Sequence, residues 1–111
     1  MAERMRRVNE AVREVVSARL AEGLRDPRIG FVTVTSVDTS PDLRHARVYV
    51  SVLGDDDERA ATMAGLESAR GVLQLAVARE LRMKHTPTLE FLFDESIDRG
   101  MRISELLSDE E

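Results

Sequence analysis

The sequence predicts a single α+β domain in which helices cover one face of a three-stranded sheet. Two patterns lead to this fold class. Residues 4–24 repeat apolar side chains at three- and four-residue steps, as an amphipathic helix does. Residues 44–53 instead alternate, with one alanine and three valines on the same side, as a half-buried strand does. A chain of 111 residues is long enough to bury one modest core.

Turn signals separate these segments and set the order of the elements. Gly23 and the run RDPRIG (25–30) end the first helix, and SPD (40–42) predicts an antiparallel hairpin. Residues 1–111 then form one domain, with an ordered core over about 4–107 and a solvated tail over 108–111. In chain order we expect a helix over 4–24, strands over 31–40 and 44–53, helices over 54–69 and 71–83, a strand over 89–94 and a short helix over 95–107.

Composition excludes several classes of protein. The chain has no cysteine, which excludes a disulfide scaffold, a thiolate metal site and a cysteine nucleophile. It has no apolar run of signal-peptide or membrane-spanning length, so we expect a cytoplasmic protein. Aromatic residues make up only 4% of the chain, so the core must be built from aliphatic side chains.

The formal net charge of −5 argues against a nucleic-acid partner, but the charges are unevenly distributed. Residues 1–30 have seven arginines against five acids, and residues 67–85 have four basic residues against two acids. Residues 86–111 have eight acids against two arginines. The protein can therefore present one basic face, and arginine suits contacts with phosphates and bases. High arginine usage can equally reflect genome composition.

The sequence contains no constellation that predicts catalysis or a bound cofactor. It lacks the glycine-rich motifs of nucleotide cradles, and His45 and His85 lack the spacing of metal ligands. The acidic run at 55–58 fits a helix start better than a cation site. Asp94 and Asp98, four residues apart, fit a turn with an N-cap as well as a metal-binding pair. We therefore expect no metal, no cofactor and no enzymatic activity.

Gly71 stands inside the stretch LESARGVLQLAVARELRMKHTP (66–87), which otherwise reads as helix. Glycine in a helix costs about 1 kcal/mol relative to alanine, so its presence needs a reason. It permits a sharp bend, a backbone conformation closed to other residues, and close approach of another molecule. We expect a kink that leaves the N–H groups of the second helix free to bind phosphate. A kink made only to fit the sheet is the alternative.

The joint Ala69-Arg70-Gly71, with a helix on each side and a sheet beside it, resembles the KH fold, whose GxxG loop binds a nucleic-acid backbone. This chain has no GxxG. An Ala-x-Gly joint in its place is similar to that of the ribosome-binding factor A family, which has a type II KH-like domain. The segments 24–54, 69–91 and 94–107 resemble that family nearly end to end, and DPRIGFVTVTSVDTSPDLRHARVYVS and DESIDRGMRI carry most of the specificity.

The resemblance implies a bacterial assembly factor that binds the free 30S ribosomal subunit and 16S rRNA and is not an enzyme. It also implies a role in late 30S maturation, in processing of the 5′ end of 16S rRNA and in growth in the cold. A monomer with no membrane partner is the simplest expectation. A functional link to ribosome-assembly GTPases stays open.

The resemblance also places the RNA-binding residues, because KH-type domains bind through the joint and the helix that follows it. The leading candidates are Arg70, Gly71, Arg79, Arg82 and Lys84. Arg79 and Arg82 are three apart and are expected to share one face of that helix. Arg6 and Arg13 can instead bridge an acid between them, and Lys84 can complement a helix C-terminus. The further candidates are basic residues of the first helix and the second strand: Arg6, Arg7, Arg13, Arg44 and Arg47.

Two other functions are consistent with the residues alone. A protein-interaction module would use the exposed face or an edge strand of the sheet, and its binding would respond little to salt. A metal-dependent hydrolase would depend on the carboxylates alone. The absence of a Mg²⁺ or Mn²⁺ site tighter than millimolar would exclude that reading.

Overall fold

Six elements build residues 2–96, the part of the chain that the computed structural model describes. They are α1 (Ala2–Glu22), β1 (Val32–Thr39), β2 (His45–Val52), α2 (Asp56–Ser68), α3 (Arg70–Leu81) and β3 (Thr88–Phe93). Each begins and ends within two residues of the bounds expected from the sequence. The expected helix over 95–107 lies outside the described residues from Ile97 onward, as does the tail over 108–111. None of the described helices combines the length and apolar composition needed to cross a membrane.

The three strands form one sheet in the order β1-β2-β3. β1 and β2 pair antiparallel, as expected for a hairpin, with Val32 opposite Val52. The register shifts between Val34 and Ser36, where β1 contains an irregularity. β3 pairs parallel to β2, a connection that the crossover through α2 and α3 allows.

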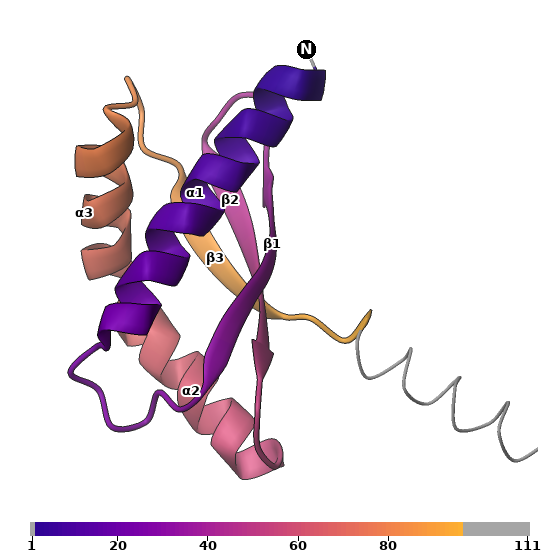
Figure 1. The fold of residues 1–111 in the computed structure, drawn as a ribbon, viewed down its shortest axis with the longest axis vertical. Helices are drawn as coiled ribbons and strands as arrows, with labels where there is room; N and C mark the ends of the chain where they lie inside the picture. Colours follow the sequence, from indigo (N-terminus) through magenta and orange to yellow (C-terminus); the bar gives the residue numbers. More distant parts are fainter. Residues whose placement is uncertain (1, 97–111) are drawn as a thin grey trace, which may run out of the picture.

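The helices cover one face of this sheet (Figure 1). α1 packs against β1 and α3, whereas α2 and α3 pack against β3. The alternation in β2 is confirmed, because Ala46, Val48, Val50 and Val52 are at most 4% exposed and their neighbours are exposed or half-buried. The predicted α+β, KH-like arrangement with helices on one face of the sheet is therefore confirmed.

The buried core is aliphatic apart from one phenylalanine, Phe91, as the scarcity of aromatic residues predicts. Val12 and Val16 of α1, Leu66 of α2 and Leu73 of α3 are fully buried within it. Burying each such side chain stabilises the fold by about 1.5–3 kcal/mol. Leu66 and Leu73 lie on either side of the joint between α2 and α3, so the core fixes the inner side of that joint.

The acidic run at 55–58 begins α2, as expected. The Asp55 side chain accepts a hydrogen bond from the backbone N–H of Glu58 at 2.8 Å, and the Glu58 carboxylate accepts one from the N–H of Asp55 at 3.3 Å. This reciprocal pair is a capping box, which satisfies backbone donors that the first turn leaves free. The run therefore has a structural role in starting the helix.

Candidate nucleic-acid interface

A single residue, Ala69, joins α2 to α3. Its backbone (φ −86°, ψ −1°) stays in the helical region, and its N–H donates to the carbonyl oxygens of Gly65 at 3.0 Å and Leu66 at 3.1 Å. The bond to Leu66 tightens the last turn of α2, and α3 then leaves in a new direction (Figure 1). The predicted kink is therefore confirmed, but it lies at Ala69 and not at Gly71.

Gly71 lies exposed in the first turn of α3. Its φ is not positive, and a Cβ placed on it would meet no atom within 4 Å. The expectation that Gly71 adopts a conformation closed to other residues is therefore wrong, because any residue adopts helical backbone angles. The N–H groups of residues 70–72 have no carbonyl partner within α3, as at any helix start. Among residues 2–96, nothing covers the backbone at this point.

Close to the joint, the glycine that packing requires is Gly65, which is buried in α2. A Cβ there would lie 2.6 Å from Cγ1 of Ile29 and 3.4 Å from a carboxylate oxygen of Asp26. Both belong to the loop between α1 and β1, which approaches the α2 backbone closely. No local sequence pattern reveals this contact, because Ile29 is distant along the chain.

Hydrogen bonds attach the same loop to α2. The Thr62 hydroxyl accepts from the N–H of Gly30 at 3.3 Å and donates to the carbonyl of Arg28 at 3.2 Å. The Arg28 guanidinium donates to Asp26 at 2.6 Å and to the Ser68 hydroxyl at 3.0 Å. The hydrogen bonds from the side chain of Arg28, and then from its backbone N–H, lower the pKa of Asp26 to about 2. The loop is therefore fixed to α2 immediately before the joint.

The leading cations surround the joint and the end of α3. Arg70 pairs with Glu67 at 2.8 Å. Arg79, Arg82 and Lys84 are exposed, and none of the three forms an ion pair with another residue of the described 2–96. These three side chains are available to an external anion.

Arg82 does not share a helix face with Arg79, and that expectation is wrong. α3 ends at Leu81, and Arg82 adopts the left-handed conformation (φ 48°, ψ 40°) with its N–H donating to the carbonyl of Ala78 at 3.2 Å. A left-handed residue turns the chain away from the helix axis. Arg82 and Lys84 therefore belong to the connection between α3 and β3.

The candidate arginines of α1 form ion pairs with acids of the same helix. Arg6 and Arg7 lie 3.9 Å and 3.4 Å from the carboxylate of Glu3. Arg13 pairs with Glu10, and this pairing lowers the pKa of Glu10 and raises that of Arg13. The expected bridge to Glu10 thus forms from Arg13, whereas Arg6 pairs with Glu3.

The candidate arginines of the second strand lie away from the joint. Arg44, just before β2, is 3.9 Å from Asp42, and Arg47 is 4.0 Å from Glu90 on β3. Arg47 is on the face of the sheet opposite the helices, as the alternation of β2 requires. The ten predicted RNA-binding residues therefore do not form one surface.

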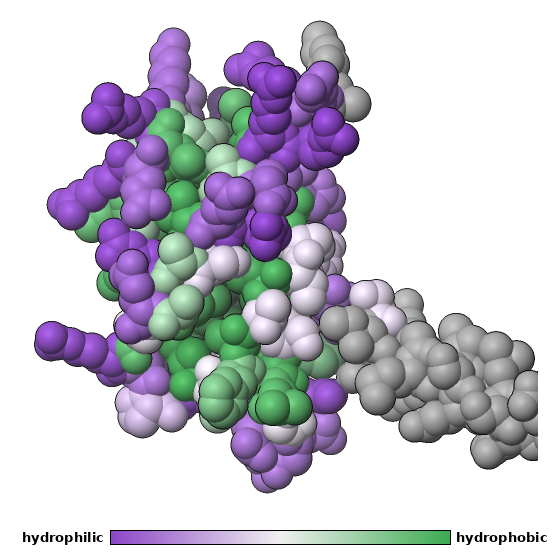
Figure 2. Space-filling model, in the orientation of Figure 1, coloured by the Kyte–Doolittle hydropathy of each residue, from purple (hydrophilic) through white to green (hydrophobic). Residues whose placement is uncertain are grey.

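Hydrophilic and apolar side chains occupy different parts of the face seen in Figure 2. Hydrophilic side chains crowd the region where α1 begins and α3 ends, whereas apolar side chains gather where α1 ends and near α2. Four large apolar residues are exposed in the described chain, and two of them, Val72 (59%) and Leu75 (51%), lie on α3.

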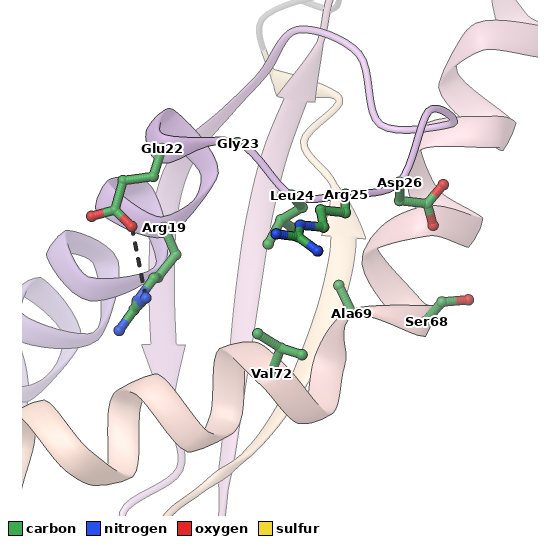
Figure 3. A pocket seen from close by; sticks show the side chains of 9 residues that line it. All are labelled: Arg19, Glu22, Gly23, Leu24, Arg25, Asp26, Ser68, Ala69 and Val72. Atoms are coloured by element: carbon green, nitrogen blue, oxygen red, sulfur yellow. Dashed lines mark ion pairs between the residues drawn. The ribbon is translucent and has the colours of Figure 1, made fainter.

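A concave surface separates the end of α1 from α3 (Figure 3). Its main part is a cavity of about 430 Å³ that continues into a smaller one of about 100 Å³ along α3. Leu24, Ala69 and Val72 surround the main cavity, and Arg25 extends over it (Figure 3). We call this surface the α1–α3 groove and define it by seven of its lining residues: Arg19, Leu24, Arg25, Ala69, Val72, Leu75 and Arg79.

Within residues 2–96, no three His, Asp or Glu side chains come together as metal ligands would. Asp94 instead ends β3, where it accepts hydrogen bonds from the N–H of Ser96 at 2.9 Å and the hydroxyl of Thr35 at 2.6 Å. Hydrogen bonding from the Ser96 side chain, then from the Thr35 hydroxyl and the Ser96 N–H, lowers the pKa of Asp94. Asp98, four residues further along the chain, lies outside the described residues.

Comparison with known proteins gives the chain a family. The family model described as ribosome-binding factor A matches residues 4–107. A ribosome-binding factor A from Anaeromyxobacter dehalogenans is 56% identical over 102 residues, which cover 91% of this chain and 74% of the relative. Another from Geobacter metallireducens is 47% identical over 109 residues, which cover 98% of this chain and 92% of the relative.

Two structures agree with this assignment. The crystal structure of ribosome-binding factor A from Thermus thermophilus matches with a TM-score of 0.69 and 30% identity, covering 79% of this chain and 93% of that one. A homology model of the Thermus thermophilus factor, fitted into a cryo-electron microscopy map of its complex with 30S, matches with a TM-score of 0.63 and 29% identity. The match covers 77% of this chain and 89% of that one. The resemblance read from the sequence is thus confirmed, and the chain belongs to the ribosome-binding factor A family.

Proposed function

We propose that this chain binds the free 30S ribosomal subunit through 16S rRNA and assists late 30S assembly, including processing of the 5′ end of 16S rRNA. It acts in the bacterial cytoplasm as a monomer, without a cofactor and without catalysing a reaction. The family assignment and the 30S complex of the Thermus thermophilus relative support this proposal. The observation that carries it is the exposed backbone at Gly71 at the start of α3, together with three cations at and beyond the end of α3 that form no ion pair within the described residues.

The joint has the chemistry that a phosphate requires. The N–H groups in the first turn of α3 have no partner inside that helix, and the helix dipole favours an anion there. Gly71 has no Cβ, so a phosphate can approach its backbone more closely than at any other residue type. The fold itself does not need a glycine at this position, so close approach of a ligand is a physical reason for one.

The cations extend this site along the chain. Arg79 lies on α3, and Arg82 and Lys84 lie in the connection that follows it. Each can neutralise a phosphate without first breaking an ion pair within the described residues. Arg70 must exchange its bond to Glu67 for the RNA, so we expect its contribution to be smaller.

The test is co-sedimentation of the purified protein with purified 30S subunits over a range of salt concentrations. If rRNA phosphates supply most of the affinity, log K falls linearly with log salt, by about 0.7–0.9 for each phosphate neutralised. We expect a slope that corresponds to several contacts. A flat response would instead favour a protein-interaction module, and absence of co-sedimentation at low salt would contradict 30S binding.

The specific roles need separate measurements. Depleting the protein is expected to leave 16S rRNA precursors with unprocessed 5′ ends, most strongly in the cold, and primer extension would detect them. Normal 5′ ends after depletion would contradict a role in processing. A link to ribosome-assembly GTPases would be seen as GTP-dependent displacement of the protein from 30S.

A further inference from the structure

We propose that the α1–α3 groove docks an acidic protein segment with apolar side chains, presented by a protein of the particle that the chain binds. This inference rests on the proposed function, because it assumes 30S binding. It goes beyond that function by assigning a protein contact next to the RNA contact at the joint.

The first observation is that α3 is apolar on both faces. Leu73, Ala76 and Val77 are buried against the core, whereas Val72 and Leu75 are 59% and 51% exposed on the outer face. A helix that is apolar all round is normally covered on both sides. Within residues 2–96, nothing covers the outer side, and the two side chains line a hollow instead of a flat surface.

The second observation is the charge around the groove. The two acids of its lining are already paired: Glu22 lies 3.7 Å from Arg19, and Asp26 is bound by Arg28. Arg25, an exposed cation of the lining that is not among the proposed RNA contacts, forms no ion pair with any residue of the described range. The charge available to a partner is therefore positive, and a partner with aspartate or glutamate complements it.

The third observation separates a protein from RNA as the occupant. Single-stranded RNA is usually bound by stacking its bases on aromatic side chains. The lining of the groove contains no aromatic residue and offers aliphatic side chains one helical turn apart, Val72 and Leu75. Hydrophobic grooves of this kind receive the apolar face of an amphipathic protein segment.

Photo-crosslinking tests the identity of the occupant. Leu75 is replaced by p-benzoylphenylalanine, the protein is bound to purified 30S subunits, and the sample is irradiated after sedimentation. Replacement of Thr33, which is exposed on the open face of the sheet, is the matched control. We expect an RNase-resistant adduct from position 75 only, and mass spectrometry should place it in a segment with apolar and acidic residues.

Three outcomes of this experiment would overturn the proposal. The first is an RNase-sensitive adduct, which would mean that RNA covers the groove. The second is an adduct to residues 97–111 of the same chain, which would mean that this segment covers the groove. The third is the absence of any adduct to a 30S protein from a variant that co-sediments. Loss of co-sedimentation by the unmodified protein would contradict the proposed function instead.

An affinity measurement gives an independent readout. Leu75→Ser is expected to weaken 30S binding about tenfold, as the loss of one well-placed apolar anchor does. The salt slope should stay unchanged, because no phosphate contact is lost, and Leu75→Ile should restore the affinity. Val72→Ser serves as the second variant if Leu75→Ser lowers the melting temperature. Unchanged affinity in a folded serine variant would overturn the proposal.

Discussion

Gly65 and Gly71 lie on either side of the same joint and have opposite surroundings. Gly65 is buried, and a Cβ there would lie 2.6 Å from Ile29. Gly71 is exposed, and a Cβ there would meet nothing within 4 Å. The first glycine is explained by packing inside the chain. Within residues 2–96, nothing packs against the second, and the close approach of another molecule is the explanation that we propose for it.

The comparison extends to the regions around the two glycines. Near Gly65, the polar side chains are bonded to each other: Thr62 to the loop backbone, and Arg28 to Asp26. Beyond Gly71, Arg79 forms no ion pair within the described residues, and the apolar outer face of α3 is uncovered there. The contacts around Gly65 therefore stabilise the fold. The exposed groups of α3 are available to bind another molecule.

The largest effect on stability is expected from Gly65→Ala. The new methyl group forces Ile29 or α2 to move, which costs about 1–3 kcal/mol, and helix propensity offsets about 1 kcal/mol of this. At Gly71, the same substitution has no steric cost and should raise the free energy of unfolding by up to about 1 kcal/mol. Urea denaturation of both variants measures the difference.

These two alanine variants control for each other, because the chemical change is identical and only the surroundings differ. Equal shifts in the free energy of unfolding would contradict the contrast between the two positions. A lower free energy of unfolding for Gly71→Ala would show that a side chain at this position strains the joint, although no atom lies close to it in the described residues.

A smaller loss is expected from Thr62→Val, which keeps the shape of the side chain and removes its hydroxyl. Thr62 is 1% exposed, and its hydroxyl bonds both the N–H of Gly30 and the carbonyl of Arg28. Leaving these groups without their partner should cost about 1 kcal/mol. Thr33→Val, at an exposed position of β1, is the control and should leave the melting temperature unchanged. Equal melting temperatures for both variants would mean that the loop is not fixed by Thr62.

The smallest effect on stability is expected from Asp26→Asn, which should change how the melting temperature depends on acid pH. The folded pKa of this carboxyl is lowered from 3.8 to about 2 by Arg28, so its contribution is present above 3.8 and is lost as the pH falls through 2. Asp26→Asn should therefore lower the melting temperature at neutral pH and reduce its decline between these two pH values. A variant with the same pH profile as the unmodified protein would contradict the pairing.

Much of the fold could be predicted from the sequence, because its causes are local. The alternation from Ala46 to Val52 requires only the two-residue period of a strand. It also places Arg47 on the face away from the helices, where the structure has it. The acids after Gly54 start α2 through a capping box that spans four residues.

The site was less predictable, because its determinants are distant in sequence or depend on backbone conformation. Gly65 and Ile29 become neighbours only when the chain folds, so the sequence does not reveal the role of Gly65. Gly71 is conspicuous in the sequence because it interrupts an apolar helical pattern. The left-handed turn at Arg82 separates it from Arg79, although their spacing is that of one helix face. The α1–α3 groove was unpredictable for the same reason, because Arg25 and Val72 line one cavity but are far apart in the sequence.

The central claim is that the joint and the residues after it bind 30S. It is tested most directly by two fourfold charge reversals with the same change in net charge. One variant replaces Arg70, Arg79, Arg82 and Lys84 by Glu, and the other replaces Arg6, Arg7, Arg44 and Arg47 by Glu. Circular dichroism melts control for folding, which exposed substitutions should alter by less than about 0.5 kcal/mol each. We expect the first variant to lose at least about tenfold in 30S affinity and the second to lose much less. Equal losses in the two variants, or no loss in either, would contradict the placement of the RNA-binding surface at the joint.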